Sequence, residues 1–163
     1  MGDDARARIL ETLQQQAIPY QLAEHPPAFT MADIEAYGLN AQGLVAKNLF
    51  LRDAKGKRHF LVVVAGDKPA DLKTLGAALG TRLSFASAER LEKYLCLQQG
   101  EVSPLGVLQD EARAVEVFFD EDLRGQARVG VHPGTNAATI FLSFENLEKI
   151  VKNHGNKVAF TRV

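Results

Sequence analysis

The chain has 163 residues, enough for one domain with a buried core, and its 46% hydrophobic and 24% charged residues are the proportions of an ordinary globular protein. The formal net charge of −1 argues against a general binder of duplex DNA, which needs a broad basic face. A lone cysteine, Cys96, excludes an internal disulfide and suits a reducing compartment. Because the sequence shows neither an apolar leader nor a run as long as a membrane span, we expect a cytoplasmic protein that does not enter membranes.

The first predicted elements are a helix, a short strand and a second, shorter helix. Apolar residues at helical spacing predict the first helix, and residues 20–24 form a candidate strand. Thr30 stands where an N-cap is expected, with Asp33 at the capping-box distance, and Gly38 is placed to end the helix. Since this helix is short and follows a proline pair, our hypothesis is that it moves as a lid over a nearby cavity.

Residues 44–52 and 59–65 predict a β-hairpin closed by the turn at 53–57. The first strand is expected to run without interruption, with its side chains alternating between two faces. Lys47 and Asn48 are exceptions, since both lie in mid-strand among apolar neighbours. A lysine there is either an edge residue whose head reaches water, or a cation that faces a cleft and grips a phosphate or hydroxyl.

Helix caps and hydrophobic patterns predict the remaining elements. Helices are expected after Asp71, Ser87 and Ser143, and strands at residues 83–85, 114–119, 126–131, 138–142 and 158–160. Strands and helices do not alternate in a strict βαβ order. The chain therefore predicts an α+β fold with a mixed, largely antiparallel sheet and surrounding helices.

The reactive side chains give little support to metal or covalent catalysis. His25, His59, His132 and His154 are far apart in the sequence and show no metal-ligand spacing, so we expect no metal and no cofactor. The sequence has no P-loop, dinucleotide fingerprint or serine nucleophile elbow. Cys96 falls in a predicted apolar helix and is expected to lie in the core rather than to act as a nucleophile.

Two loops rich in glycine and proline remain, at residues 100–106 and 130–136. In the second loop, Pro133 pushes His132 toward extended geometry, while Gly134 and Asn136 tolerate a left-handed backbone. This loop joins two predicted strands, so it is either a hairpin turn that happens to carry a histidine or part of a binding site. Two such loops and a strand lysine suit a pocket whose backbone N–H groups stabilise charge on a carbonyl oxygen.

Three motifs follow one another in an informative order. They are Lys47-Asn48 within residues 45–51, the loop Gly100-Glu101-Val102-Ser103-Pro104, and the loop Gly130-Val131-His132-Pro133-Gly134-Thr135-Asn136. Together they resemble the YbaK/ProX superfamily of aminoacyl-tRNA editing domains, relatives of the insertion domain of bacterial prolyl-tRNA synthetases. The resemblance covers about residues 5–160, and the segment 25–30 points to the free-standing ProX (PrdX) branch.

The resemblance implies a single editing domain over residues 1–163, with a barrel-like core of mixed, largely antiparallel strands. It implies a trans-editing hydrolase that deacylates mischarged tRNA, above all alanine on proline tRNA. The acceptor end of the mischarged tRNA is the implied partner, with prolyl-tRNA synthetase as a further one, and no duplex DNA, membrane or cofactor is implied. The neighbouring ribose hydroxyl of the tRNA would help to activate water.

The resemblance also implies the site residues. Lys47 would contact the phosphate or ribose of the terminal adenosine, the backbone from Gly100 to Pro104 would surround the ester carbonyl, and His132 would help to shape the amino-acid pocket. The implied catalytic set is Lys47, Gly100, Ser103, Pro104 and His132, and the implied substrate-binding set is Asn48, Glu101, Val102, Gly130, Val131, Pro133, Gly134 and Asn136.

Two other interpretations stay open at this level. A YbaK-like enzyme that removes cysteine or another small residue from proline tRNA would carry the same motifs. A nucleic-acid or protein-binding module would keep the fold without catalysis. A basic patch is also predicted, which would steer RNA unless it is an ordinary solvated hairpin turn; it comprises Lys47, Lys55, Lys57, Arg58 and Lys68.

Overall fold

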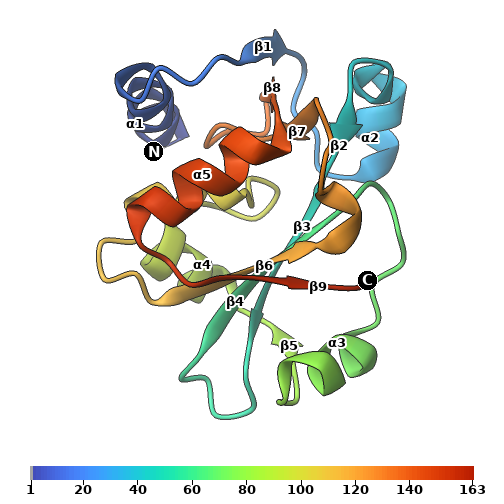
Figure 1. The fold of residues 1–163 in the computed structure, drawn as a ribbon, viewed down its shortest axis with the longest axis vertical. Coiled ribbons are helices and arrows are strands. Elements are labelled where there is room, and N and C mark those ends of the chain that lie inside the picture. Colours follow the sequence, from blue (N-terminus) through green and yellow to red (C-terminus); the bar gives the residue numbers. More distant parts are fainter. Residues whose placement is uncertain (1) are drawn as a thin grey trace.

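The computed structural model describes residues 2–163, and within this range the strands form two open, mixed sheets (Figure 1). The five-stranded sheet has the order β5 (Ser84–Phe85), β3 (Lys47–Arg52), β4 (His59–Val64), β6 (Val115–Asp120), β9 (Val158–Thr161). Strand β3 is antiparallel to β4 and β5, whereas β6 is parallel to both β4 and β9. The predicted hairpin of β3 and β4 is confirmed.

The four-stranded sheet has the order β1 (Gln21–Glu24), β8 (Ala138–Leu142), β7 (Val129–Val131), β2 (Leu44–Val45). Strand β8 is antiparallel to both neighbours, and β2 is parallel to β7. The α+β class with mixed sheets is thus confirmed. The barrel-like core is wrong, because the described strands divide between two open sheets and do not close on themselves.

Helices cover these sheets and begin where the sequence predicts caps. The α-helices of the described chain are α1 (Gly2–Gln15), α2 (Met31–Ala36), α3 (Leu72–Leu79), α4 (Ala88–Leu95) and α5 (Phe144–His154), with 3-10 turns η1 (Leu39–Ala41), η2 (Pro104–Gln109) and η3 (Glu121–Leu123). Thr30, Asp71, Ser87 and Ser143 each accept a backbone N–H in the first turn that follows, and the Thr30–Asp33 capping box is complete. None of these helices is long and apolar enough to cross a membrane.

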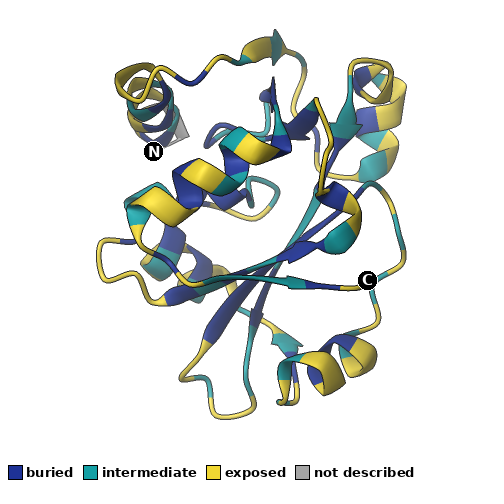
Figure 2. Ribbon diagram, viewed as in Figure 1, coloured by how far each residue is buried: buried dark blue, intermediate teal, exposed yellow. Residues whose placement is uncertain are grey.

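Alternation along β3 and β4 separates two parts of the core, one on each face of the five-stranded sheet. Phe50 and Leu61 join the larger part with α1, α4, α5 and η2, and Leu51 and Phe60 join a smaller part beneath α3. Figure 2 shows the central strands buried and the outer side of α5 exposed. Because both faces of this sheet are covered, β4 is buried along its whole length.

The segment 44–52 does not form the uninterrupted strand predicted above. Strand β2 pairs with β7, and the Ala46 amide still donates to the Gly130 carbonyl at 2.9 Å. From Lys47 onward the partner is β4, in the other sheet. The chain therefore passes from one sheet to the other at Ala46, and this junction brings Lys47 and Asn48 beside β7.

Cys96 lies outside the core, contrary to the prediction. Helix α4 ends at Leu95, and Cys96 follows as its C-cap with a left-handed φ of 55°. The cysteine side chain is exposed. The error arose because the apolar stripe of α4 was extended one residue beyond the point where the helix ends.

Candidate functional site

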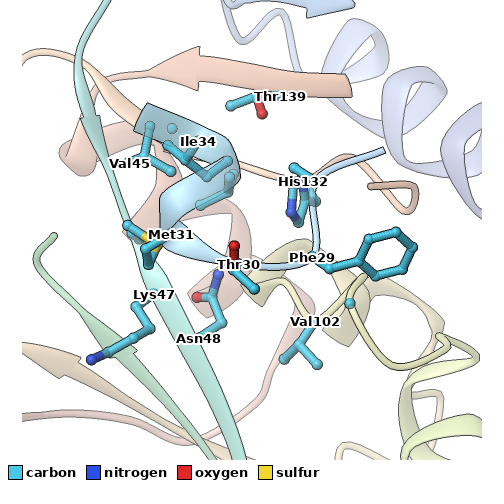
Figure 3. Close-up of a pocket in the computed structure, with 15 residues that line it drawn as sticks. Phe29, Thr30, Met31, Ile34, Val45, Lys47, Asn48, Val102, His132 and Thr139 are labelled. Atoms are coloured by element: carbon cyan, nitrogen blue, oxygen red, sulfur yellow. The ribbon is translucent and has the colours of Figure 1, made fainter. Parts of the chain in front are cut away.

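A cavity of about 300 Å³ lies at the junction of the two sheets, beneath helix α2 (Figure 3). Its floor comes from β2, β3, β7 and β8, its roof from α2 and the segment before it, and one side from the loop after α4. The lining residues are Ala28, Phe29, Thr30, Met31, Ile34, Val45, Ala46, Lys47, Asn48, Gly100, Val102, Gly130, Val131, His132 and Thr139. All three sequence motifs therefore contribute to one cavity, although the first and last are more than 80 residues apart.

The structure brings seven of the thirteen predicted site residues into the cavity wall. These are Lys47, Asn48, Gly100, Val102, Gly130, Val131 and His132. The other six lie outside the wall; they are Glu101, Ser103, Pro104, Pro133, Gly134 and Asn136. The two loops thus reach the cavity by their first residues only.

Local structure explains why the later loop residues turn away. The Ser103 hydroxyl accepts the Leu105 N–H at 3.2 Å and caps η2, where Pro104 occupies the first turn, and both residues are buried. The Glu101 carboxylate accepts the Gln98 N–H at 2.9 Å instead of facing the cavity. In the other loop, a Cβ on Gly134 would lie 2.9 Å from the backbone of Ala5, so this glycine packs against α1.

The sequence placed the helix after Thr30 over a cavity, but none of the roof residues was among the predicted site residues. Residues 28–31 and Ile34 line the cavity from the segment that the Thr30 capping box predicts. Ile34 is 3% exposed and fixes α2 against the core. Whether α2 opens as a lid remains a hypothesis from its length and position.

The Lys47 ammonium is anchored at one edge of the cavity. It donates to the Lys68 carbonyl and lies 3.9 Å from an Asp67 carboxylate oxygen. Lys68 is itself held by Asp120 at 2.8 Å and by Asp122 at 2.5 Å. Hydrogen bonds to these two carboxylates raise the pKa of Lys68. A chain of polar contacts therefore fixes where the Lys47 cation sits.

The predicted basic patch does not form one surface. The Lys68 cation is neutralised by two aspartates, and Arg58 is paired with Glu116 at 2.9 Å. Lys55 and Lys57 stand in the hairpin turn, at the end of β3 remote from Lys47. Six residues of strand separate these two ends by roughly 17–20 Å, so only Lys47 is left at the cavity.

Asn48 presents an unused acceptor beside the cavity. Its Oδ1 is buried without a hydrogen-bond partner. Among the described residues, no other buried side-chain oxygen or nitrogen atom lacks a partner. In Figure 3 the Asn48 amide lies beneath Thr30, while the Lys47 ammonium extends away from both. A buried acceptor without a donor costs about 1–3 kcal/mol, which a ligand N–H or O–H would offset.

His132 is positioned as a neutral imidazole. Its Nδ1 lies 3.0 Å from the Ala138 carbonyl, so Nδ1–H donates and Nε2 keeps its lone pair. Burial lowers the pKa of His132, and the nearby His25 lowers it further against the opposing effect of the Ala138 hydrogen bond. The neutral form that results can accept a proton or hydrogen bond at neutral pH.

His25 is a second histidine at the site, which the sequence analysis considered only as a metal ligand and as part of the segment 25–30. Its Nε2 lies 2.9 Å from the hydroxyl of Thr139 on the cavity floor, and its Nδ1 lies 2.7 Å from the Pro26 carbonyl. The ring stacks on Tyr37, the C-cap of α2, with 5.6 Å between ring centroids. The proline pair that follows His25 was the available sequence signal.

Gly100 lets the backbone approach closely at the cavity rim. It occupies the third position of a turn closed by a 3.0 Å hydrogen bond from the Glu101 N–H to the Gln98 carbonyl. Its φ of 88° belongs to a conformation that other residues rarely adopt. A Cβ there would lie 3.0 Å from the Phe29 ring. The turn therefore favours glycine at this position, and a side chain there would also displace the Phe29 ring.

These features define a class of protein. The cavity is small, offers a cation, an amide acceptor and a neutral imidazole, and has no cysteine or serine in its wall. Among residues 4–163 no group of three or more histidine, cysteine or acidic side chains is placed to hold a metal ion. Such a site suits the binding and orientation of a small group by positioned polar contacts, without a cysteine or serine nucleophile in the wall.

Comparison with known proteins identifies the family. The model of the aminoacyl-tRNA editing domain family matches residues 25–150, which contain all three motifs. The chain belongs to this family, and it is an aminoacyl-tRNA deacylase.

Two relatives cover nearly the whole chain. Prolyl-tRNA editing protein ProX of Acetoanaerobium sticklandii is 50% identical over 157 residues, 96% of each chain. Prolyl-tRNA synthetase associated domain-containing protein 1 of Mus musculus is 35% identical over 159 residues, 95% of this chain and 94% of the relative.

A solved structure supports the fold. The crystal structure of a candidate trans-editing enzyme for prolyl tRNA synthetase aligns with a TM-score of 0.74 at 24% identity, covering 98% of this chain and 97% of that one. At this level of identity the likeness shows that the two chains share their α+β architecture.

Proposed function

We propose that the protein is a free-standing editing enzyme that removes alanine from proline tRNA. The prolyl-tRNA editing protein to which it is 50% identical supports proline tRNA as the substrate class. The observation that carries the choice of a small amino acid is the cavity, whose volume of about 300 Å³ is at the lower limit for ligand sites. A cytoplasmic location beside the prolyl-tRNA synthetase follows from this substrate.

Physical chemistry explains why such an enzyme is needed. A synthetase site that admits the five-membered ring of proline cannot exclude alanine by size. The lost contacts of a methylene group or so discriminate by only about 1–3 kcal/mol. A second site that admits the smaller residue and excludes the larger removes the errors. A cavity closed by Ile34 and Val45 around a methyl group would reject proline by steric clash.

The cavity residues divide the work of ester hydrolysis. Lys47 holds the phosphate or ribose of the terminal nucleotide, and the Asn48 oxygen accepts a hydrogen bond from the substrate's ammonium group. The backbone at Gly100 and Val102 surrounds the ester carbonyl, and His132 closes the wall next to the amino-acid side chain. These residues position the ester; none of them forms a covalent bond to it.

Water completes the reaction. Oriented by the neighbouring ribose hydroxyl, a water molecule adds to the carbonyl carbon, and the bond from that carbon to the ribose oxygen then breaks. The carboxylate leaves as alanine, and the ribose oxygen takes up a proton. Dependence on this hydroxyl makes the enzyme specific for RNA.

Hydrolysis of a panel of charged tRNAs tests this function. Proline tRNA carrying alanine, cysteine, serine or proline is compared with alanine tRNA carrying alanine. Rapid release from alanyl-tRNA(Pro), with prolyl-tRNA(Pro) spared, is the expected result. Preferred release of cysteine would assign the chain to the YbaK-like activity, and no release by a folded sample would leave a binding module as the better description.

Lys47→Ala tests the assigned cation, with Lys55→Ala as the matched control in the remote hairpin turn. Loss of a charge-assisted contact of about 1.5–3 kcal/mol corresponds to a fall in kcat/KM of about 10- to 150-fold for Lys47→Ala. The control should deacylate like the wild type. Equal activities of the two variants would remove Lys47 from the site.

A further inference from the structure

The floor of the cavity is apolar around Gly130. This residue has no side chain, so its neighbours approach the space beside it. Cγ2 of Val45 lies 3.1 Å, and Cγ2 of Thr139 lies 3.2 Å, from the position that a Cβ on Gly130 would occupy. All three residues line the cavity. The floor at this point therefore presents two methyl groups.

The direction of the Thr139 side chain is set by His25. Threonine carries a methyl and a hydroxyl on the same carbon, and rotation about χ1 exchanges their directions. Here the Thr139 oxygen lies 2.9 Å from Nε2 of His25. His25 stands outside the cavity wall, whereas Gly130 is part of it. The hydroxyl therefore points out of the cavity toward His25, and the methyl is the group on the cavity side.

The other nitrogen of the His25 ring shows which partner donates in this hydrogen bond. Nδ1 lies 2.7 Å from the Pro26 carbonyl, which can only accept, so Nδ1 carries the proton. In the neutral imidazole Nε2 is then an acceptor, and the Thr139 hydroxyl donates to it. The one proton of this hydroxyl is thus committed to His25 and cannot be donated to a ligand.

His25 is itself held from two sides. Its amide donates to the Ala137 carbonyl at 3.1 Å, which keeps the backbone beside β8. Its ring stacks on Tyr37, with 5.6 Å between the ring centroids and 27° between the ring planes. The nitrogen that binds Thr139 therefore has a fixed position, and the Thr139 methyl has one as well.

The Thr139 methyl lies at the end of the cavity that the proposed function gives to the amino-acid side chain. In Figure 3 Thr139 and Ile34 are at the opposite end from Lys47 and Val102. Lys47 is assigned to the nucleotide and Val102 to the ester, so the side chain of the amino acid extends toward Thr139. A methyl group suits an apolar floor, whereas a hydroxyl placed there loses its hydration without gaining a partner.

We propose that His25 is a positioning residue which keeps the floor apolar and thereby discriminates alanine from serine. The proposal rests on the function proposed above. Alanine and serine differ by one oxygen atom, so a sieve for size separates them poorly. An apolar site rejects a residue with an added hydroxyl by about 100-fold at most. We therefore expect the wild type to prefer alanyl- to seryl-tRNA(Pro), in kcat/KM, by about 10- to 100-fold.

His25→Phe should lower this preference. It keeps a ring to stack on Tyr37 but cannot accept the Thr139 proton, so the hydroxyl turns toward the cavity and can bind a serine hydroxyl. We expect the ratio of kcat/KM for alanine to that for serine to fall about tenfold, and to fall likewise in His25→Ala. His25→Gln carries an amide oxygen that can accept the Thr139 proton and should keep most of the wild-type ratio. His154→Ala, at the end of α5, is the control for loss of a histidine elsewhere.

A double substitution separates positioning from a merely structural role. Thr139→Val replaces the hydroxyl by a second methyl, so the floor stays apolar in every orientation of the side chain. This variant should retain the wild-type ratio without help from His25. Adding His25→Phe to Thr139→Val should then leave the ratio unchanged, even where the kcat/KM values for alanine and serine both fall.

Three results would overturn the proposal. One is equal release of serine and alanine by the wild type, because another acceptor, such as Nε2 of His132, would then satisfy the serine hydroxyl. Another is a wild-type ratio in both His25→Phe and His25→Ala. The third is an equal fall of the ratio on adding His25→Phe to the wild type and to Thr139→Val. A folded wild type that releases neither amino acid would instead refute the proposed function itself.

Discussion

Acidification should destabilise this protein through two histidines, of which one is buried and one half-buried. His59 is 1% exposed, packs against Tyr94 in a tilted arrangement with 4.0 Å between ring centroids, and has its Nε2 3.0 Å from a guanidinium nitrogen of Arg90. Burial lowers the pKa of His59, and the Arg90 charge lowers it further. Burial likewise lowers the pKa of His132 in the cavity wall. Both imidazoles therefore resist protonation in the folded state.

The sign and size of the effect follow from proton linkage. Below the usual histidine pKa of 6.5 the unfolded chain binds a proton at each position, while the folded chain binds fewer. Stability is therefore complete above pH 6.5 and falls as the pH drops, until the folded-state pKa is reached. Each histidine contributes up to about 1.36 kcal/mol per pH unit to the slope of the free energy of unfolding. His59 and His132 together contribute up to about 2.7 kcal/mol per pH unit.

Denaturant unfolding at pH 7.5, 6.0 and 5.0 measures the slope of the free energy of unfolding against pH. These pH values lie above the range in which carboxylates with lowered pKa values, such as Glu116, titrate. His59→Gln and His132→Gln should each remove about half of the slope, whatever they do to the stability at pH 7.5. A free energy of unfolding that stays constant from pH 7.5 to 5.0 would refute the reasoning. So would a full slope retained by the double variant.

Two further substitutions test how the site is held. Asp120→Asn weakens the buried acceptor of the Ala65 amide and of the Lys68 ammonium, so we expect a loss of about 1–3 kcal/mol. It should also lower kcat/KM at temperatures where the variant is fully folded, since Lys68 anchors Lys47; unchanged kcat/KM would argue against that anchoring. Gly100→Ala imposes about 1–2 kcal/mol of left-handed strain and crowds Phe29, whereas Gly125→Ala, with φ 78° and open space, imposes the strain alone. Thermal unfolding and deacylation compare the two, and equal kcat/KM values would show that the Gly100 rim does not touch the substrate.

Much of the fold was determined by the sequence at short range. The Thr30 capping box, the Ser87 and Ser143 caps and the β3–β4 hairpin all form as predicted. In the caps the hydrogen-bond partners are three residues apart, and the hairpin pairs two strands that are adjacent in the sequence, so the nearby sequence contains each interaction. The three motifs, through the family that they resemble, also named seven residues of the cavity wall.

The tertiary structure alone decided which of these residues meet. The chain changes sheets at Ala46 because β7 and β4 both offer pairing partners, and these strands come from distant parts of the sequence. Ser103 and Pro104 turn into η2, and Lys68 is neutralised by Asp120 across 52 residues. Local propensity and periodicity specify how each segment folds. Long-range pairing and packing decide which segments adjoin, and here that decision placed a cavity between two sheets.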